Sequence, residues 1–123
     1  MPASYHIDRK VGVVFTTLTD YVTDEDLLDH QRRLLADPDF RPMMHQCIDA
    51  RGVTGGGTVT GGGIRTLAKA NIYADGSRRA IIVSGKMAYG FARMFQILRS
   101  KGPEKIQICR RVEDAHRWLG LVE

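Results

Sequence analysis

The sequence predicts one α/β domain: an N-terminal β-hairpin, then alternating helices and strands that build a mostly parallel or mixed five-stranded sheet flanked by helices. Strand-like runs alternate with amphipathic helical segments from residue 23 onward, a pattern that implies parallel strands joined by right-handed crossovers. The 123 residues suit a single hydrophobic core, and no repeat, linker or low-complexity tail divides them. We therefore expect a single domain over residues 1–123.

The first third of the chain predicts a hairpin followed by a helix. Residues 5–8 alternate apolar and polar side chains, the turn RKVG follows, and residues 13–18 are rich in β-branched and aromatic side chains. Thr23 is a favourable N-cap, and the three acidic residues after it suit the first turn of a helix. That helix ends at Asp37-Pro38, because the residue before a proline disfavours helical geometry.

Three more strands and three more helices are expected in the remainder. Ile64, Leu67 and Ala68 lie at helical spacing, and the continuous apolar run 80–83 is typical of a strand covered on both faces. The pair Gly102-Pro103 is a strong stop signal for the helix before it. The predicted strands span 45–53, 80–83 and 106–109, and the predicted helices span 61–71, 86–98 and 112–119.

The composition is that of an ordinary globular protein, with 43% hydrophobic and 26% charged residues. The first residues lack the apolar stretch of a secretory signal, and no apolar run is long enough to cross a bilayer. We therefore expect a cytoplasmic protein without a membrane span. Cys47 and Cys109 lie in strand segments away from any CxxC or Cys/His cluster, which favours buried free thiols over a disulfide or a metal site.

Charge is unevenly distributed along the chain. Residues 1–50 carry 5 basic and 9 acidic side chains, whereas residues 51–123 carry 13 and 5. If the basic side chains gather on one face, that face attracts anions; an evenly spread, solvated surface is the alternative. Nucleic-acid binding is not expected, because neither a single-strand stacking motif nor a recognition-helix signature accompanies the basic half.

The carboxyl ends of the predicted parallel strands are the expected place for a site, since ligands of open α/β sheets bind there. Asp49 and Arg51 lie at one strand end, Ser84 and Lys86 at the next, and Arg110 at the last. Together with the start of the 61–71 helix these residues form an anion-friendly set.

The stretch TGGGTVTGGG, residues 54–63, leads into that helix. It lacks the Lys-Ser/Thr ending of a P-loop and the spacing of a dinucleotide-binding GxGxxG motif. What remains is a set of backbone N–H groups that could form an anion nest, with hydroxyls on Thr58 and Thr60. The two open interpretations are specific phosphate binding and a mobile connection between strand and helix.

No catalytic constellation is evident in the sequence. The four histidines are scattered, and none has metal-ligand spacing to a second His, Cys or carboxylate. Asp49 could act as a base or could cap the following loop, and no GxSxG elbow surrounds Ser84. We therefore expect a protein that is not an enzyme and that has neither a cofactor nor a metal ion.

The segment KMAYGFARMFQIL, residues 86–98, combines methionine and aromatic side chains. One interpretation is a core helix that lies on the sheet. The other is a partly exposed surface for a partner or an apolar ligand, because flexible thioethers suit adaptable contacts. Tyr89 and Arg93 are the members of this segment that we expect to be exposed.

The runs CIDARGVT and GGIRTLAKA resemble the strand–loop–helix unit of STAS domains, the group that includes anti-sigma factor antagonists. A wider similarity to small bacterial STAS/Sec14-like proteins of unknown role includes LLADPDFRP, AYGFARMF and AHRWLGL, and so spans nearly the whole chain. The resemblance implies an α/β domain that acts by binding rather than by catalysis. Its Sec14 side implies lipid-like or other apolar ligands.

In antagonists of this family, a serine at the start of the second helix is phosphorylated to switch partner binding. If the helix starts at Ile64, the family's turn corresponds to Thr60, Gly61, Gly62 and Gly63, so glycine replaces the serine. Thr58 and Thr60 are the hydroxyls that could take its place. This departure argues against a phosphoserine switch of the family's kind.

Two functions are therefore expected. The first is a regulatory domain that binds a protein partner, or a second copy of itself, through the 54–63 loop, the following helix and the surface around Tyr89 and Arg93. The alternative is a protein that binds a small anionic or lipid-like ligand in the strand-end crevice, with Arg51 and Lys86 as anion contacts.

Overall fold

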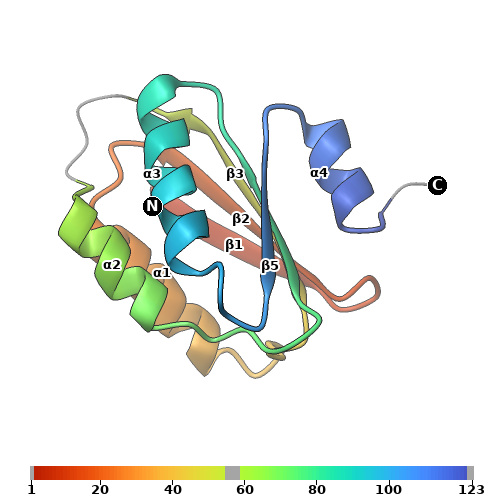
Figure 1. Ribbon diagram of the computed structural model, residues 1–123. Helices are drawn as coiled ribbons and strands as arrows, with labels where there is room; N and C mark the ends of the chain where they lie inside the picture. The colour runs from red at the N-terminus through yellow and green to blue at the C-terminus, as the bar shows by residue number, and fades with distance from the viewer. Residues whose placement is uncertain (1, 55–58, 122–123) are drawn as a thin grey trace.

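The computed structural model describes residues 2–54 and 59–121, which form a five-stranded sheet with helices on both faces (Figure 1). Strand order along the sheet follows the chain, β1-β2-β3-β4-β5. The elements are β1 (Ala3–Asp8), β2 (Val13–Asp20), α1 (Asp24–Ala36), β3 (His45–Val53), α2 (Gly61–Lys69), β4 (Arg78–Ile82), α3 (Lys86–Leu98), β5 (Lys105–Cys109) and α4 (Val112–Trp118).

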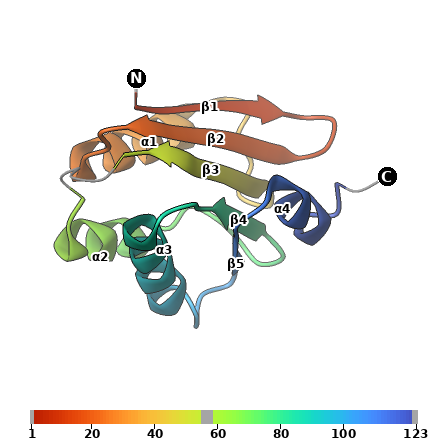
Figure 2. The same cartoon turned by 90° about the horizontal axis from the view of Figure 1, so that it is seen from above.

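The sheet is mixed, because β1 pairs antiparallel with β2 and every later neighbour pairs in parallel. A tight turn at Gly12, whose φ is 71°, joins the two hairpin strands. With strand order equal to chain order, right-handed crossovers place α1, α2 and α3 on one face of the sheet. The last helix, α4, packs on the other face (Figure 2).

Alternation along each strand divides the core into two layers. Val13, Cys47 and Ala80 pack with Ala115 and Leu119 on the α4 side. On the opposite side two clusters lie beneath the other helices: one buries residues of β3, β4, α2 and α3, and the second packs Val14 against α1 and the loops. Both faces of β4 are therefore covered, as its apolar run predicts.

The structure confirms the α/β class and every predicted element, and it moves some of their ends. Thr60 caps α2, so that helix begins at Gly61 and ends at Lys69, before the predicted limit. The fourth strand begins at Arg78 rather than at Ala80. Its two additional residues are arginines, which the apolar pattern excluded from the predicted strand.

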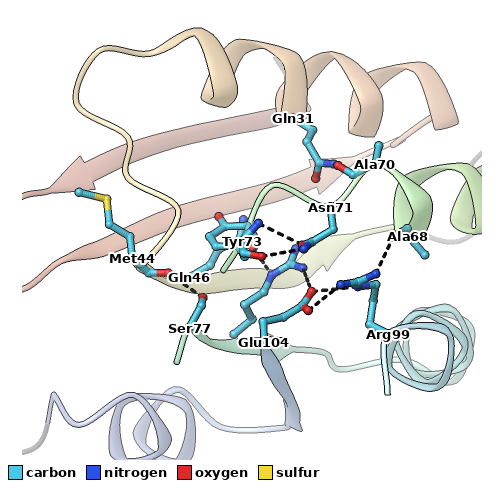
Figure 3. Close-up of polar contacts among 11 residues, drawn as sticks. Gln31, Met44, Gln46, Ala68, Ala70, Asn71, Tyr73, Ser77, Arg99 and Glu104 are labelled. Carbon is cyan, nitrogen blue, oxygen red and sulfur yellow. Dashed lines mark hydrogen bonds and ion pairs between the residues drawn. The ribbon is translucent and has the colours of Figure 1, made fainter. Parts of the chain in front are cut away.

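Arg79 is the centre of a polar cluster inside the core, where it is 4% exposed. Its Nε donates to Gln46 Oε1 at 3.0 Å and its Nη1 donates to Glu104 at 3.1 Å. Arg99 donates to both carboxylate oxygens of Glu104, at 2.9 and 2.7 Å (Figure 3). The guanidinium of Arg79 also lies 4.4 Å from the ring centre of Tyr73. Burial alone would favour neutral Glu104, but the hydrogen bonds from Arg99 and the two positive charges lower its pKa below the usual range.

The polar cluster continues to α1 through Thr16. Gln46 Nε2 donates to Thr16 Oγ1 at 3.1 Å, and the same oxygen lies 3.1 Å from His30 Nε2. Burial, followed by the positive charges of Arg33 and Arg79, lowers the pKa of His30 to about 4, although Asp29 opposes the change. His30 is therefore neutral at pH 7.

Replacing Glu104 by glutamine should lower the free energy of unfolding by about 3–5 kcal/mol, because the buried guanidinium of Arg79 and the partly buried guanidinium of Arg99 lose their counter-ion. Glu113→Gln is the matched control, since Glu113 pairs with Arg111 at the exposed surface and its loss should cost less than about 1 kcal/mol. Urea denaturation of both variants measures the difference. Equal stability of the two variants would contradict a central role for Glu104.

Stability should also fall as the pH is lowered from 6.5 towards 4. The unfolded chain takes up a proton at His30 below pH 6.5, whereas the folded chain does so only near pH 4. The loss over this window amounts to at most about 3 kcal/mol for a shift of this size. Denaturation of the wild type and His30→Gln at several pH values tests this, because the variant should lack this part of the slope. His6→Gln, at an exposed position, should keep it, and parallel curves for all three proteins would contradict the prediction.

Candidate functional site

The carboxyl ends of β3, β4 and β5 meet at one edge of the sheet. Ser84 Oγ donates to the carbonyl oxygen of Arg51 at 3.3 Å, and Arg110 Nη1 donates to the carbonyl oxygen of Ser84 at 3.3 Å. The structure therefore brings Arg51, Ser84 and Arg110 together, and Lys86 begins α3 beside them.

The side chains at this edge nevertheless divide between the two faces. Ile48 and Ala50 face the helices α2 and α3, so alternation places Asp49 and Arg51 on the α4 side. Asp49 accepts hydrogen bonds from the backbone N–H of Arg51 and from its Nε and Nη2, at 3.1, 2.9 and 2.7 Å. These hydrogen bonds lower the pKa of Asp49. The two residues thus pair with each other, and a ligand of Arg51 would compete with Asp49.

An apolar hollow of about 140 Å³ lies between the sheet and helices α2 and α3. Its wall contains Arg79 and otherwise only apolar residues, including Val22 and Leu27 at the start of α1. A second hollow of about 290 Å³ adjoins it and shares Val22, Val53, Val59, Ala88 and Phe91 with it. This second hollow reaches the sheet edge, where Thr54, Ser84, Gly85, Lys86 and Met87 line it.

The start of α2 is occupied by a carboxylate from the chain itself. Asp24, the first residue of α1, accepts hydrogen bonds from the backbone N–H of Thr60 at 2.9 Å and from its hydroxyl at 2.7 Å. Thr60 Oγ1 in turn accepts from the backbone N–H of Gly63 at 3.0 Å. A Cβ at Gly63 would overlap the Asp24 carboxyl group, so a side chain at this position would displace that carboxylate. The favourable position for an anion at this helix start is therefore filled internally.

The remaining residues of the glycine stretch are less constrained. Gly61 and Gly62 would meet only ordinary contacts if they carried a Cβ. Thr58 lies outside the described residues, together with 55–57, so its expected role in binding stays a prediction. No local pattern marks the link between Asp24 and Thr60, because the two residues are 36 positions apart.

Helix α3 has one side buried in the core and another side exposed to solvent. Ala92 and Phe95 are buried in the core, whereas Met87 is 58% and Tyr89 40% exposed. The guanidinium of Arg110 lies 5.2 Å from the ring centre of Tyr89. Arg93 is exposed and donates a hydrogen bond to Gln96. The expected exposure of Tyr89 and Arg93 is thus observed, and their contact with a ligand or partner stays a prediction.

Within residues 2–54 and 59–121, no three His, Cys, Asp or Glu side chains are placed to hold a metal ion. Both cysteines are free and buried, and burial raises the pKa of Cys47 to about 11, so that its thiol stays protonated. His45 Nδ1 accepts a hydrogen bond from the backbone N–H of Arg78. Both residues begin their strands and so lie at the end of the sheet opposite to the candidate site. None of the described helices is long and apolar enough to span a bilayer.

Comparison with known proteins supports the fold. No protein-family model matches the chain, and no curated protein matches it. Among solved structures, it is similar to an uncharacterized protein of the DUF3478 family from Shewanella loihica, which has a SpoIIAA-like fold. The TM-score is 0.60 at 15% sequence identity, over 95% of this chain and 91% of that one. The chain therefore has a SpoIIAA-like, that is STAS-like, fold, as its resemblance to STAS domains implies.

Two neighbouring glycines of α2 should respond oppositely to alanine. Gly62→Ala should stabilise the protein by several tenths of a kcal/mol to about 1 kcal/mol, because alanine favours the helix and nothing obstructs its Cβ. Gly63→Ala should destabilise it by about 1 kcal/mol, because the Asp24 carboxylate must leave its position at the helix start.

Chemical denaturation of both variants measures these changes. Combining Gly63→Ala with Asp24→Ala separates the causes, since without the carboxylate the alanine at 63 should no longer be unfavourable. If Gly63→Ala is harmful to the same extent in both backgrounds, the proposed overlap is not the cause.

Proposed function

We propose that this STAS-like domain is a binding module that takes a small, mainly apolar molecule into the hollow between the sheet and helices α2 and α3. The observation that carries this proposal is the near-absence of polar residues from the wall of the inner hollow, together with its continuity with the sheet edge. Sites for small molecules are typically concave and apolar, with a few polar groups that orient the ligand.

The size of the hollow fits this role. An empty apolar cavity of about 150 Å³ holds a molecule such as benzene. The inner hollow has nearly that volume, about 140 Å³, and the adjoining hollow adds about 290 Å³. A short hydrocarbon chain could therefore extend from the sheet edge into the core.

Apart from Arg79 in the inner wall, the polar residues that line the two hollows lie where the hollow reaches the surface. Lys86 and Ser84 line this mouth and both are exposed. A ligand with a hydrocarbon chain and one acidic end would place its chain inside and its acidic end near the Lys86 ammonium group. This arrangement keeps both charges in contact with water, which avoids the cost of burying an ion pair.

The rim of the same edge supports a second candidate, the binding of a protein partner. Met87, Tyr89 and Tyr21 are 58%, 40% and 65% exposed. Tyr21 follows β2 at this edge, and the other two lie on the first turns of α3. Exposed aromatic and methionine side chains are enriched at protein interfaces. Under this candidate, Tyr21→Ser would weaken partner or self-association, measured by sedimentation velocity, and would leave small-molecule affinity unchanged, because Tyr21 lines neither hollow.

Calorimetric titration with decanol and decanoate tests the first candidate. Both probes should bind the wild type, and Ala88→Trp should weaken binding at least about tenfold, which corresponds to 1.4 kcal/mol of lost contact. Ala88 lines both hollows, so a large side chain there obstructs the passage between them. Ala36→Trp, at the exposed end of α1, is the matched control and should bind normally.

The role of the lysine is tested in the same titrations. Lys86→Ala should weaken decanoate binding more than decanol binding. Absence of binding to the wild type, or equal affinities for Ala88→Trp and Ala36→Trp, would contradict the proposed site.

A further inference from the structure

The fifth strand, β5, is the edge strand of the sheet at the end opposite to β1. It pairs with β4 through Lys105, whose N–H donates to Ser77, and through the carbonyl oxygen of Cys109, which accepts from Val83. Alternation turns the backbone N–H and C=O groups of Ile106 and Ile108 away from β4. In the described part of the chain, the one partner of these outward groups is Gln96, whose Nε2 donates to the Ile106 carbonyl at 2.8 Å.

A hollow of about 380 Å³ lies beside the start of this open edge. Arg93, Gln96 and Ile97 line it from α3, and Trp118 lines it from α4. Lys105 and Ile106 of β5 lie between them. The start of the strand is therefore flanked by side chains from both faces of the sheet. Figure 1 shows β5 between helices α3 and α4.

The hollow carries a net positive charge. Arg93, Arg99 and Lys105 line it, and the one carboxylate among its residues is Glu104. Glu104 already accepts hydrogen bonds from Arg99 at both oxygens and from Arg79 at one. The charges of Arg93 and Lys105 thus have no ion-pair partner in the described residues. An acidic group would complement them.

Trp118, which also lines this hollow, has an unsatisfied hydrogen-bond donor. Its indole Nε1 is buried and has no hydrogen-bond acceptor among the described residues. A buried N–H without an acceptor is unfavourable, and native proteins rarely leave one unsatisfied.

We propose that an extended, acidic segment of a partner protein binds along β5 as a sixth strand. Its backbone would pair with the outward groups of Ile106 and Ile108, and its carboxylates would lie near Arg93 and Lys105. A second copy of this chain fits less well, since pairing β5 with itself would bring the cationic side chains of both copies together. This surface and the apolar hollow of the proposed function lie in different parts of the fold, so either can fail independently of the other.

Nuclear magnetic resonance with two short peptides tests the proposal. The probes are an acetylated and amidated heptapeptide of alternating glutamate and valine, and a second peptide with lysine in place of glutamate. The protein has one tryptophan, so its indole N–H signal reports on Trp118 alone. The acidic peptide should shift this signal and slow hydrogen exchange at the Ile108 amide, and the basic peptide should do neither. Protection of that amide distinguishes strand pairing from binding through side chains alone.

Charge-reversal variants locate the site. Lys105→Glu should weaken binding of the acidic peptide at least about tenfold, the scale expected when a close charge pair becomes repulsive. Lys69→Glu on α2 makes the same change in net charge and should alter affinity less than about twofold. Thermal unfolding of both variants establishes that they are folded.

Several outcomes would overturn the proposal. These are the absence of any change at Trp118 and Ile108, equal responses to the acidic and basic peptides, and equal affinities for the two variants. A response to a single-stranded oligothymidylate without a response to the acidic peptide would also overturn it, and would assign the cationic hollow to nucleic acid instead.

Discussion

The ion pair between Arg79 and Glu104 is the constraint on which the arrangement of the core depends. A buried guanidinium is tolerated only where its N–H groups have hydrogen-bond acceptors. The acceptors of Arg79 are Gln46 on β3 and Glu104 just before β5. Gln46 is the register partner of Arg79. A slip of one residue would turn Arg79 towards α4 and leave its guanidinium without hydrogen-bond partners. The polar cluster therefore specifies the strand register more sharply than apolar packing does.

The same constraint shapes the candidate site. Arg79 lies in the wall of the inner hollow, where its bonds to neighbouring strands and loops hold it against Tyr73 and Phe95. The facing helix α3 contributes the small side chains of Ala88 and Ala92, and the neighbouring strand contributes that of Ala50. A fixed polar cluster and small residues on the facing elements therefore leave space that larger aliphatic side chains would fill.

Local signals were sufficient to predict the elements, but the contacts of the site depend on residues distant in sequence. Thr23, the apolar run of β4 and the Gly102-Pro103 stop each act over a few residues, and their elements were predicted correctly. Glu104 is 25 residues from Arg79, and no local pattern marks it as buried. The prediction of the site uses only the fact that its residues lie at the carboxyl ends of neighbouring strands. Alternation within β3 separates Arg51 from the apolar hollow, and the sequence contains that information.

The carboxylate of Asp24 at the start of α2 affects how any external anion could act there. Because it belongs to the same molecule, its effective concentration at this helix start is fixed by the fold and does not fall on dilution. A free anion must compete with it at every protein concentration, and the displaced carboxylate must then be solvated elsewhere. The beginnings of α1 and α2 thus share one charge, and a group that bound at either would change the electrostatic environment of both.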